Sequence, residues 1–366
     1  MLLRYCFLGL LVFSLFGCET EVDLNAPYEK YTTVYGLIDL SADTQVVRVN
    51  KSFLGAGSAY DFAMINDSSE YHPDEVEVFI EFGNQTVELE PHYTDRQPGV
   101  FYDEDVLVYI TTEEFDVDAQ GNPIDVNSQY NQLPDEYKVI VKVDGKTITG
   151  TTEATYLRST YSVSDPNPNL PSLAWGSVNS NGDNFLNKQM VMKSVPPGER
   201  YEARVIFHYR DHYTDGTSAA KSFEFPIGSH SIPVGSSEQT FNMDYSPQSI
   251  FNTIADNVDC NGVSYRTLED TEFIMLTAGA DLSRYITVNN PVTGVVTERP
   301  EYSNIEGENA IGLFSSRYKL SVSKPFNGNT RELLFTGETT GHLCFCDDSP
   351  GSLFPCPDIS SECDCN

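Results

Sequence analysis

Strand-like alternation of apolar and polar side chains dominates the first part of the chain. Runs of this kind cover residues 45–53, 75–81, 85–90, 136–143 and 146–152, and residues 31–38 are rich in β-branched and aromatic side chains, which also favour a strand. The last two are separated by Asp144-Gly145, and an Asp-Gly pair between alternating runs is a strong signal for a β-hairpin. Short strands with regular turns over about 130 residues are typical of a β-sandwich, so we predict an immunoglobulin-like sandwich domain over residues 31–158.

A turn-rich segment follows the predicted sandwich. Residues 164–171 read Ser-Asp-Pro-Asn-Pro-Asn-Leu-Pro, a composition that favours a stiff, extended linker, and we place this linker at 159–175. Trp175, the only tryptophan of the chain, is expected to pack between the two domains, and stacking on a sugar is the alternative. Further strand-like runs cover residues 188–193, 200–213, 221–227, 272–276 and 318–323. They predict a second, mainly β domain over residues 176–343.

Two short helices are expected within the second domain. Ser246 and Pro247 are residue types that favour the cap and the first position of a helix. Apolar residues then recur at helical spacing, namely Ile250, Phe251, Ile254 and Val258. A second helix is predicted over 281–286, with Asp281 at its start. The predicted fold class is therefore mainly β, with an immunoglobulin-like sandwich first and a mostly β domain with one or two short helices second.

The amino-terminal residues have the pattern of a bacterial export signal. Arg4 is the only charged residue before Cys18, and residues 5–16 form an apolar run. This run is too short to span a hydrocarbon core of about 30 Å, but it fits a secretory signal peptide. It ends Leu15-Phe16-Gly17-Cys18, which resembles the lipobox of bacterial lipoproteins, in which the thiol is diacylated and the leader is cleaved. We predict a signal peptide at 1–17 and a lipid on Cys18; the alternative is an ordinary secretory leader.

The residues directly after Cys18 are acidic. Glu19, Glu21 and Asp23 alternate with uncharged residues, and we expect residues 18–30 to form an acidic tether. An acidic cluster at this place resembles the signal that sends lipoproteins of the Bacteroidota to the outer leaflet of the outer membrane. A plain solvated linker is the alternative. The sequence thus predicts a lipid-anchored outer-membrane protein that faces the cell exterior.

Cysteine usage agrees with an oxidising compartment. Cys6 belongs to the predicted leader and Cys18 to the anchor, and the remaining cysteines are Cys260, Cys344, Cys346, Cys356, Cys363 and Cys365. An even number in an exported protein predicts disulfides, and full pairing requires Cys260 to join one cysteine of the tail, residues 344–366. A metal site that includes His342 and a set of free thiols are the alternatives. Most zinc knuckles have two residues between paired cysteines, whereas both close pairs here have one.

The charge excludes one large class of partners. The chain has 22 Lys and Arg against 54 Asp and Glu, for a formal charge of −32. Nucleic acid is therefore not expected as a partner, because phosphate contacts need clustered basic residues. The sequence also contains no G-x-S-x-G, H-E-x-x-H or G-x-x-x-x-G-K-[ST] motif. Paired carboxylates for glycoside hydrolysis have no diagnostic value among so many acids.

Two stretches invite a metal interpretation. His208 and His212 have the spacing of a helical metal pair, but the surrounding residues alternate as in a strand, where positions four apart are about 13 Å apart. Asp116, Asp118 and Gln120 copy the first half of an EF-hand loop, although position twelve is Asn127 and not Glu. We keep a weak Ca²⁺ site at these three residues as one interpretation and a plain acidic loop as the other. No other cofactor is expected.

Three parts of the chain resemble a large family of Bacteroidota surface lipoproteins that carry a domain of unknown function. They are residues 18–21, the hairpin at 137–152, and residues 299–317 with Arg299-Pro-Glu-Tyr-Ser-Asn-Ile305 and Ala310-Ile-Gly-Leu-Phe-Ser-Ser-Arg317. The resemblance implies an immunoglobulin-like amino-terminal half and a gene beside a TonB-dependent outer-membrane transporter. It supplies no catalytic residues. Read from the residues themselves, Ile311, Leu313 and Phe314 are expected in a core; a loop that faces a partner is the alternative.

Three functions are compatible with the sequence. The favoured one is a non-catalytic accessory lipoprotein that docks onto an outer-membrane β-barrel of the TonB-dependent transporter type. The others are a free-standing surface protein that binds glycan or peptide, and an exported hydrolase. Loops at the ends of sandwiches often carry function, and the candidate partner-binding loops are 55–69, with Tyr60 and Phe62 as anchors, and 116–130.

Overall fold

The structure is a computed structural model that describes residues 29–52, 61, 65–94, 105–289, 301–359 and 362–363. The predicted signal peptide, Cys18, Tyr60, Phe62 and Cys365 lie outside the described residues. Within the described ranges the chain is mainly β with few short helices, as predicted. None of the helices in those ranges is long and apolar enough to cross a membrane.

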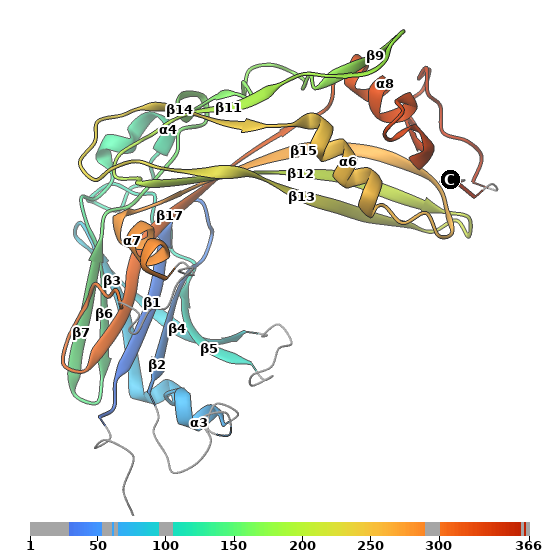
Figure 1. The fold of residues 1–366 in the computed structure, drawn as a ribbon. Helices are drawn as coiled ribbons and strands as arrows, with labels where there is room; N and C mark the ends of the chain where they lie inside the picture. The colour runs from blue at the N-terminus through green and yellow to red at the C-terminus, as the bar shows by residue number, and fades with distance from the viewer. Residues whose placement is uncertain are drawn as a thin grey trace, which may run out of the picture.

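Two β bodies meet at a bend (Figure 1). The first body contains β1 (Thr32–Asp39), β2 (Gln45–Lys51), β3 (Val76–Phe82), β4 (Gln85–Thr94), β5 (Val106–Thr111), β6 (Tyr137–Val143) and β7 (Lys146–Thr152). One layer has the order β1-β2-β5-β4, and the other has the order β4-β3-β6-β7. This is the strand arrangement of an immunoglobulin-like sandwich, so the predicted fold is confirmed.

Strand β4 belongs to both layers of the first body. Its residues 85–89 pair with β3, and its residues 90–94 pair with β5. The inward residues of both layers form one core, in which Val34, Val78, Ile80 and Val139 are fully buried. Four short helical turns fill the connections: α3 (Asn66–Ser69), η1 (Pro73–Glu75), α4 (Val126–Gln129) and η2 (Tyr130–Gln132).

Tyr137, at the start of β6, fixes one corner of the sandwich. Its ring is fully buried and its hydroxyl donates a hydrogen bond of 2.9 Å to the carbonyl oxygen of Phe115. Burial raises the pKa of Tyr137, so the hydroxyl keeps the proton that it donates. Immunoglobulin-like folds use a tyrosine at the same place, known as the tyrosine corner.

Residues from the far end of the chain complete the first body. β16 (Ile305–Glu306) pairs with β7, and the first half of β17 (Ala310–Lys324) runs parallel to β1. Phe314 of β17 is fully buried in the first core. A Cβ on Gly36 would come within 3.0 Å of its ring, and a Cβ on Gly150 within 3.0 Å of its Cβ. Segments 305–306 and 310–317, which the sequence analysis placed in the second domain, therefore belong to the sandwich.

The second body is built on four long antiparallel strands. These are β12 (Arg200–Tyr213), β13 (Ser218–Ser231), β15 (Val263–Ala278) and the second half of β17, in the order β13-β12-β15-β17. A second sheet contains β8 (Val163–Asp165), β11 (Lys188–Lys193) and β14 (Thr240–Tyr245), and a hairpin contains β9 (Gly176–Asn179) and β10 (Gly182–Phe185). The helices and remaining elements are α5 (Ser159–Ser162), α6 (Pro247–Asn257), α7 (Ala280–Asn289), α8 (Gly328–Thr336), η3 (Gly341–Leu343) and β18 (Phe345–Cys346).

Both predicted helices are present, and the short α5 and the longer α8 were missed. Ser246 caps α6 by accepting a hydrogen bond from the Ser249 backbone at 3.1 Å, with Pro247 in the first position as expected. α7 covers the predicted range 281–286. α8 begins with Gly328, Asn329 and Thr330, which have low intrinsic helix propensity, and Asn327 supplies its cap.

Trp175 corrects the predicted linker. The side chain is fully buried in the core of the second body, with its ring centroid 4.8 Å from that of Phe326 and 6.3 Å from that of Phe273. Its indole donates to the Tyr245 hydroxyl at 3.2 Å. Trp175 therefore does not pack between the two bodies, and part of the segment 159–175 folds into the second one. Its large apolar ring gains more from this enclosed core than from an exposed junction.

Candidate functional site

An apolar groove lies on the outer surface of the first body. It is lined by side chains of β1, β2, β17 and α7, and we define the outer groove by its apolar members Tyr35, Leu37, Val46, Leu282, Tyr285 and Leu313. Its volume is about 380 Å³. Tyr35 is 40% exposed and Val46 is 43% exposed, so large apolar side chains stand open to solvent here. Clustered exposed apolar residues mark interaction surfaces.

Strand register explains why these side chains gather. Leu37 lies opposite Val46 on β2, and Tyr35 lies opposite Leu313 on β17. Directly opposite residues point to the same side of a sheet. Phe314, the next residue after Leu313, points the other way into the sandwich core. Ile311 shares the outer side and is 36% exposed, so the prediction that it would pack into a core is wrong.

Helix α7 forms one wall of the outer groove because β17 holds its first turn. The Gly279 backbone donates to the Ser316 carbonyl at 2.9 Å, and the Leu282 backbone donates to the Ser315 hydroxyl at 2.9 Å. The ring of Tyr285 then meets the ring of Tyr35 edge-on, with centroids 6.3 Å apart. Burial, assisted by the hydrogen bond with Tyr285, raises the pKa of Tyr35 to about 12. Tyr35 therefore offers a neutral hydroxyl.

One rim of the outer groove is polar. Arg317 donates to a carboxylate oxygen of Asp39 at 2.7 Å, and the Asp39 backbone donates to the Gln45 side chain at 2.9 Å. An apolar centre with a polar rim is the usual anatomy of a protein–protein interface. The arrangement can bind an apolar side chain from a partner.

A second concavity, the junction cleft, lies where the two bodies meet. Its volume is about 490 Å³, and its walls include the end of β7, the loops 194–199 and 232–236, and the start of α7. Burial raises the pKa of Glu199, with Arg284 opposing the shift and Asp281 adding to it. Asp281 also accepts a hydrogen bond from Tyr302 and lies 3.4 Å from the Arg284 guanidinium. The cleft can hold a small polar ligand.

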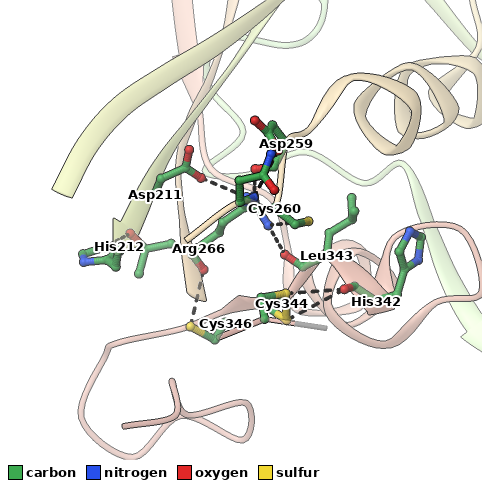
Figure 2. Close-up of polar contacts among 12 residues, drawn as sticks. Asp211, His212, Asp259, Cys260, Arg266, His342, Leu343, Cys344 and Cys346 are labelled. Atoms are coloured by element: carbon green, nitrogen blue, oxygen red, sulfur yellow. Dashed lines mark hydrogen bonds and ion pairs between the residues drawn. A yellow bond between two sulfur atoms is a disulfide. The ribbon is translucent and has the colours of Figure 1, made fainter. Parts of the chain in front are cut away.

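The tail is fixed to the second body through Arg266 (Figure 2). The guanidinium is fully buried and lies 2.9 Å from a carboxylate oxygen of Asp211. It donates to the carbonyl oxygens of Leu343, at 2.7 Å, and of Asp259, at 2.6 Å. The removal of one partner from a buried ion pair typically costs about 3–5 kcal/mol. Arg266 thus connects β12, the segment after α6 and the residues that precede the tail.

Disulfides bind the tail together, as predicted. Cys344 pairs with Cys363 and Cys346 pairs with Cys356. Cys260 is also disulfide-bonded, and none of these four cysteines is its partner. Cys365, the remaining cysteine of the tail, lies outside the described residues, so the predicted bridge from Cys260 to a tail cysteine stays a prediction.

The candidate Ca²⁺ loop is closed by its own hydrogen bonds. A carboxylate oxygen of Asp118 accepts from the Gln120 backbone and from the Asn122 backbone, both at 2.9 Å. These donors, first among them Asn122, hold the pKa of Asp118 below its usual range, whereas burial raises the pKa of Asp116. In the described part of the chain, no three His, Cys, Asp or Glu side chains are grouped to hold a metal. The weak Ca²⁺ site stays a prediction.

The two histidines of β12 lie on a strand, as predicted from the alternation around them. His208 lies 3.2 Å from a carboxylate oxygen of Glu272, and His212 lies 3.0 Å from the Thr267 hydroxyl. Each ring therefore has its own partner on β15.

Sequence reasoning did not find the outer groove. Its members come from segments that are far apart in the chain, namely 35–46, 282–285 and 313. One signal was available: the run 31–38 has large apolar residues at both odd and even positions, as in a strand that is covered on both faces. The predicted loop anchors Tyr60 and Phe62 lie outside the described residues and stay predictions.

Comparisons with known proteins give little further guidance. No protein-family model and no curated protein matches the chain. Among solved structures, the C-terminal globular domain of an oligosaccharyltransferase from Pyrococcus abyssi is similar at 9% identity, with a TM-score of 0.25. The match covers 67% of this chain and 48% of that one, so the chain spans about half the length of this relative.

Proposed function

We propose that the protein is a non-catalytic lipoprotein, anchored to the outer membrane through Cys18 and facing the cell exterior. It acts as an accessory subunit of an outer-membrane β-barrel complex of the TonB-dependent transporter type, and it belongs to the Bacteroidota lipoprotein family that its sequence resembles. The observation that carries the proposal is the outer groove, an apolar surface with Tyr35 and Val46 open to solvent. A protein gains no folding stability from such exposure, whereas a partner that covers it gains binding energy.

The shape of the groove favours a protein partner over a reaction. A volume of about 380 Å³ can accept one or two apolar side chains of a partner, and the Asp39–Arg317 pair at the rim can orient them. Such an anchor supports stable binding only within a larger interface that buries roughly 1,200 Å² or more.

The experiment compares two substitutions at equally exposed apolar residues. Val46 lies in the groove and Leu186 lies after β10 in the second body, and each is 43% exposed. We expect native lipoprotein extracted in mild detergent to bring down an outer-membrane β-barrel. Val46→Lys should reduce the recovered barrel about tenfold or more, because a lysine would be buried in an apolar contact. Leu186→Lys should leave the recovery unchanged.

Three results would contradict this function. They are the recovery of no β-barrel, equal losses from the two lysine variants, and the same membrane fractionation for Cys18→Ser as for wild type. Circular dichroism of the variants shows whether each remains folded.

A second candidate function rests on the junction cleft. Its volume of about 490 Å³ falls in the range of small-molecule sites, which favours a free-standing surface protein that binds a glycan or peptide. Glycan-array and peptide-array binding tests this candidate, with Arg284→Ala as the variant that should abolish binding there. Binding that survives this substitution would place the ligand elsewhere.

A further inference from the structure

The main sheet of the second body ends in a long strand. β13 pairs with β12 on one side and stands last in the strand order. Figure 1 shows it along the margin of the second body. In the described part of the chain, no strand pairs with its other side. An edge strand presents unpaired backbone groups that can template pairing with another strand.

Proline and the register shift, two features that discourage such pairing, are confined to one half of β13. Pro226 and Gly228 lie in the second half, and the register with β12 shifts between Ala203 and Arg204, opposite these residues. Prolines and bulges are standard ways to protect a sheet edge. The first half, Ser218–Phe225, contains neither, and it is longer than the typical strand of about 5–6 residues.

The apolar core of the second body reaches this edge and stops there. Phe223, Phe225 and Ile227 pack against the core but are only partly buried. The ring of Phe223 stacks on that of Tyr209 with centroids 5.6 Å apart. A further strand beside β13 would cover the exposed side of this row. Burial of this apolar area would stabilise the pairing.

Charge makes this edge suited to self-association. The chain carries a formal charge of −32, which opposes contact between copies over most of the surface. β13 is an exception, because its only acidic and basic residues besides His230 are Lys221 and Glu224. Glu224 is paired with Arg204 at 3.0 Å. The edge is therefore close to neutral.

We propose that β13 pairs antiparallel with β13 of a second copy of this chain, around a two-fold axis at Phe223. In this register Phe223 meets its own counterpart, Lys221 lies opposite Phe225, and Ser222 lies opposite Glu224. No like charges face each other, and the partly buried aromatic residues of both copies form one row. A two-fold interface must be self-complementary in this way. The two long sheets then join into one.

The test uses the exported chain with Cys18→Ser, so that no lipid or micelle holds copies together. We expect sedimentation velocity to show a concentration-dependent dimer. Ser222→Glu places a carboxylate opposite Glu224 of the other copy and should raise the dissociation constant about tenfold or more, or 1.4 kcal/mol. Thr147→Glu is the control, because it makes the same charge change at an exposed position of β7.

The outcomes decide the proposal in either direction. A protein that stays monomeric at all concentrations up to about 100 µM overturns the proposal, because its dissociation constant would then be too high to hold a dimer together in dilute solution. A dimer that Ser222→Glu leaves intact, or that Thr147→Glu weakens equally, also overturns it. These results do not depend on whether the outer groove binds a β-barrel, so a failure here leaves the proposed function standing.

Discussion

The cores of the two bodies are built from different side chains. The first core consists mostly of valine and isoleucine from neighbouring strands, such as Val78, Ile80 and Val139. The second core is rich in aromatic residues and methionine, with Trp175 surrounded by Tyr245, Phe251, Phe273 and Phe326. β-branched residues fit a regular pleated layer, whereas large rings fill the irregular space between a sheet and mixed covering elements.

Locality in the sequence separates the two bodies as well. Hairpins such as β6–β7 bring together residues that are close in the chain. In the second body, Leu173 forms a β-bridge with Phe326, which lies far along the chain. The backbone N–H of Trp175 donates a hydrogen bond of 2.9 Å to the Thr330 hydroxyl. The fold of the first body therefore follows mostly from sequence patterns within neighbouring strands, whereas that of the second body depends mostly on contacts between distant residues. Strand β17 is the exception, because it belongs to both bodies.

The largest expected effect comes from cutting the chain where the sequence suggests a linker. A fragment of residues 29–158 lacks β16 and the first half of β17, so β1 has a free edge and the place of Phe314 is empty. We expect it to show no cooperative urea transition. Fusion of residues 301–317 through a flexible linker should restore the transition, and the same fusion with Phe314→Ala should not. A fragment that unfolds like the intact first body would show that the sandwich is independent of β17.

A single side chain gives the next largest effect. Phe314→Ala in the full chain should lower the free energy of unfolding by about 3–5 kcal/mol, because the ring is fully buried in the first core. Ile311→Ala, on the same strand but 36% exposed, should cost less than about 1 kcal/mol. Urea denaturation followed by tyrosine fluorescence measures both. Similar losses for the two variants would contradict the assignment of Phe314 to the sandwich core.

The disulfides of the tail should stabilise the second body alone. Replacement of Cys346 and Cys356 by alanine opens a loop with a sequence separation of 10, which should cost about 2–3 kcal/mol. Fluorescence of Trp175 reports the second body, and its transition should move while that of the first body stays. Non-reducing peptide mapping of the wild type should recover Cys344–Cys363, Cys346–Cys356 and Cys260–Cys365. Recovery of Cys260 as a free thiol would refute the last pair.

The smallest effect concerns the polar face of the second body. Burial opposes the ionisation of Glu272, but hydrogen bonds from Ser321 and His208 outweigh it and hold the pKa of Glu272 below its usual 4.5. The folded-state pKa is thus lower than the unfolded one, so this group stabilises the fold above pH 4.5 and loses its contribution as the pH falls through the folded pKa. Glu272→Gln should flatten this acid loss of stability.

Ser321→Ala is the matched variant for that experiment, because its hydroxyl donates to Glu272 at 2.5 Å. It should remove part of the same acid dependence. Thermal unfolding between pH 3 and pH 6 measures how steeply the melting temperature falls with decreasing pH. An unchanged dependence in Glu272→Gln would assign the acid sensitivity to other carboxyl groups.

The sequence predicted those elements whose signals are local. Residues 137–152 form the expected hairpin because Asp144-Gly145 supports the turn, with both residues at positive φ. α6 begins where Ser246 and Pro247 placed it. β5 was missed because burial at nearly every position, Val106–Ile110, removes the alternation that marks a half-exposed strand.

The position of β17 and the outer groove could not be predicted in this way. The ion pair between Asp39 and Arg317 joins residues 278 apart, and no pattern near either residue points to the other. Gly312 illustrates the point: its φ is positive, and a Cβ at this position would lie 1.9 Å from the Val34 carbonyl oxygen on the neighbouring strand. Only the paired strands make that requirement visible.

The shared strand also sets an order in time. β1 leaves the ribosome well before its parallel neighbour, residues 310–317, because each paired residue of that neighbour lies 278 positions later in the chain. Domains usually fold in the order of their synthesis. Here the first body waits until nearly the whole second body has been made, and β1 keeps an open edge during that interval. During that interval the incomplete chain exposes an unpaired strand edge that the completed fold covers.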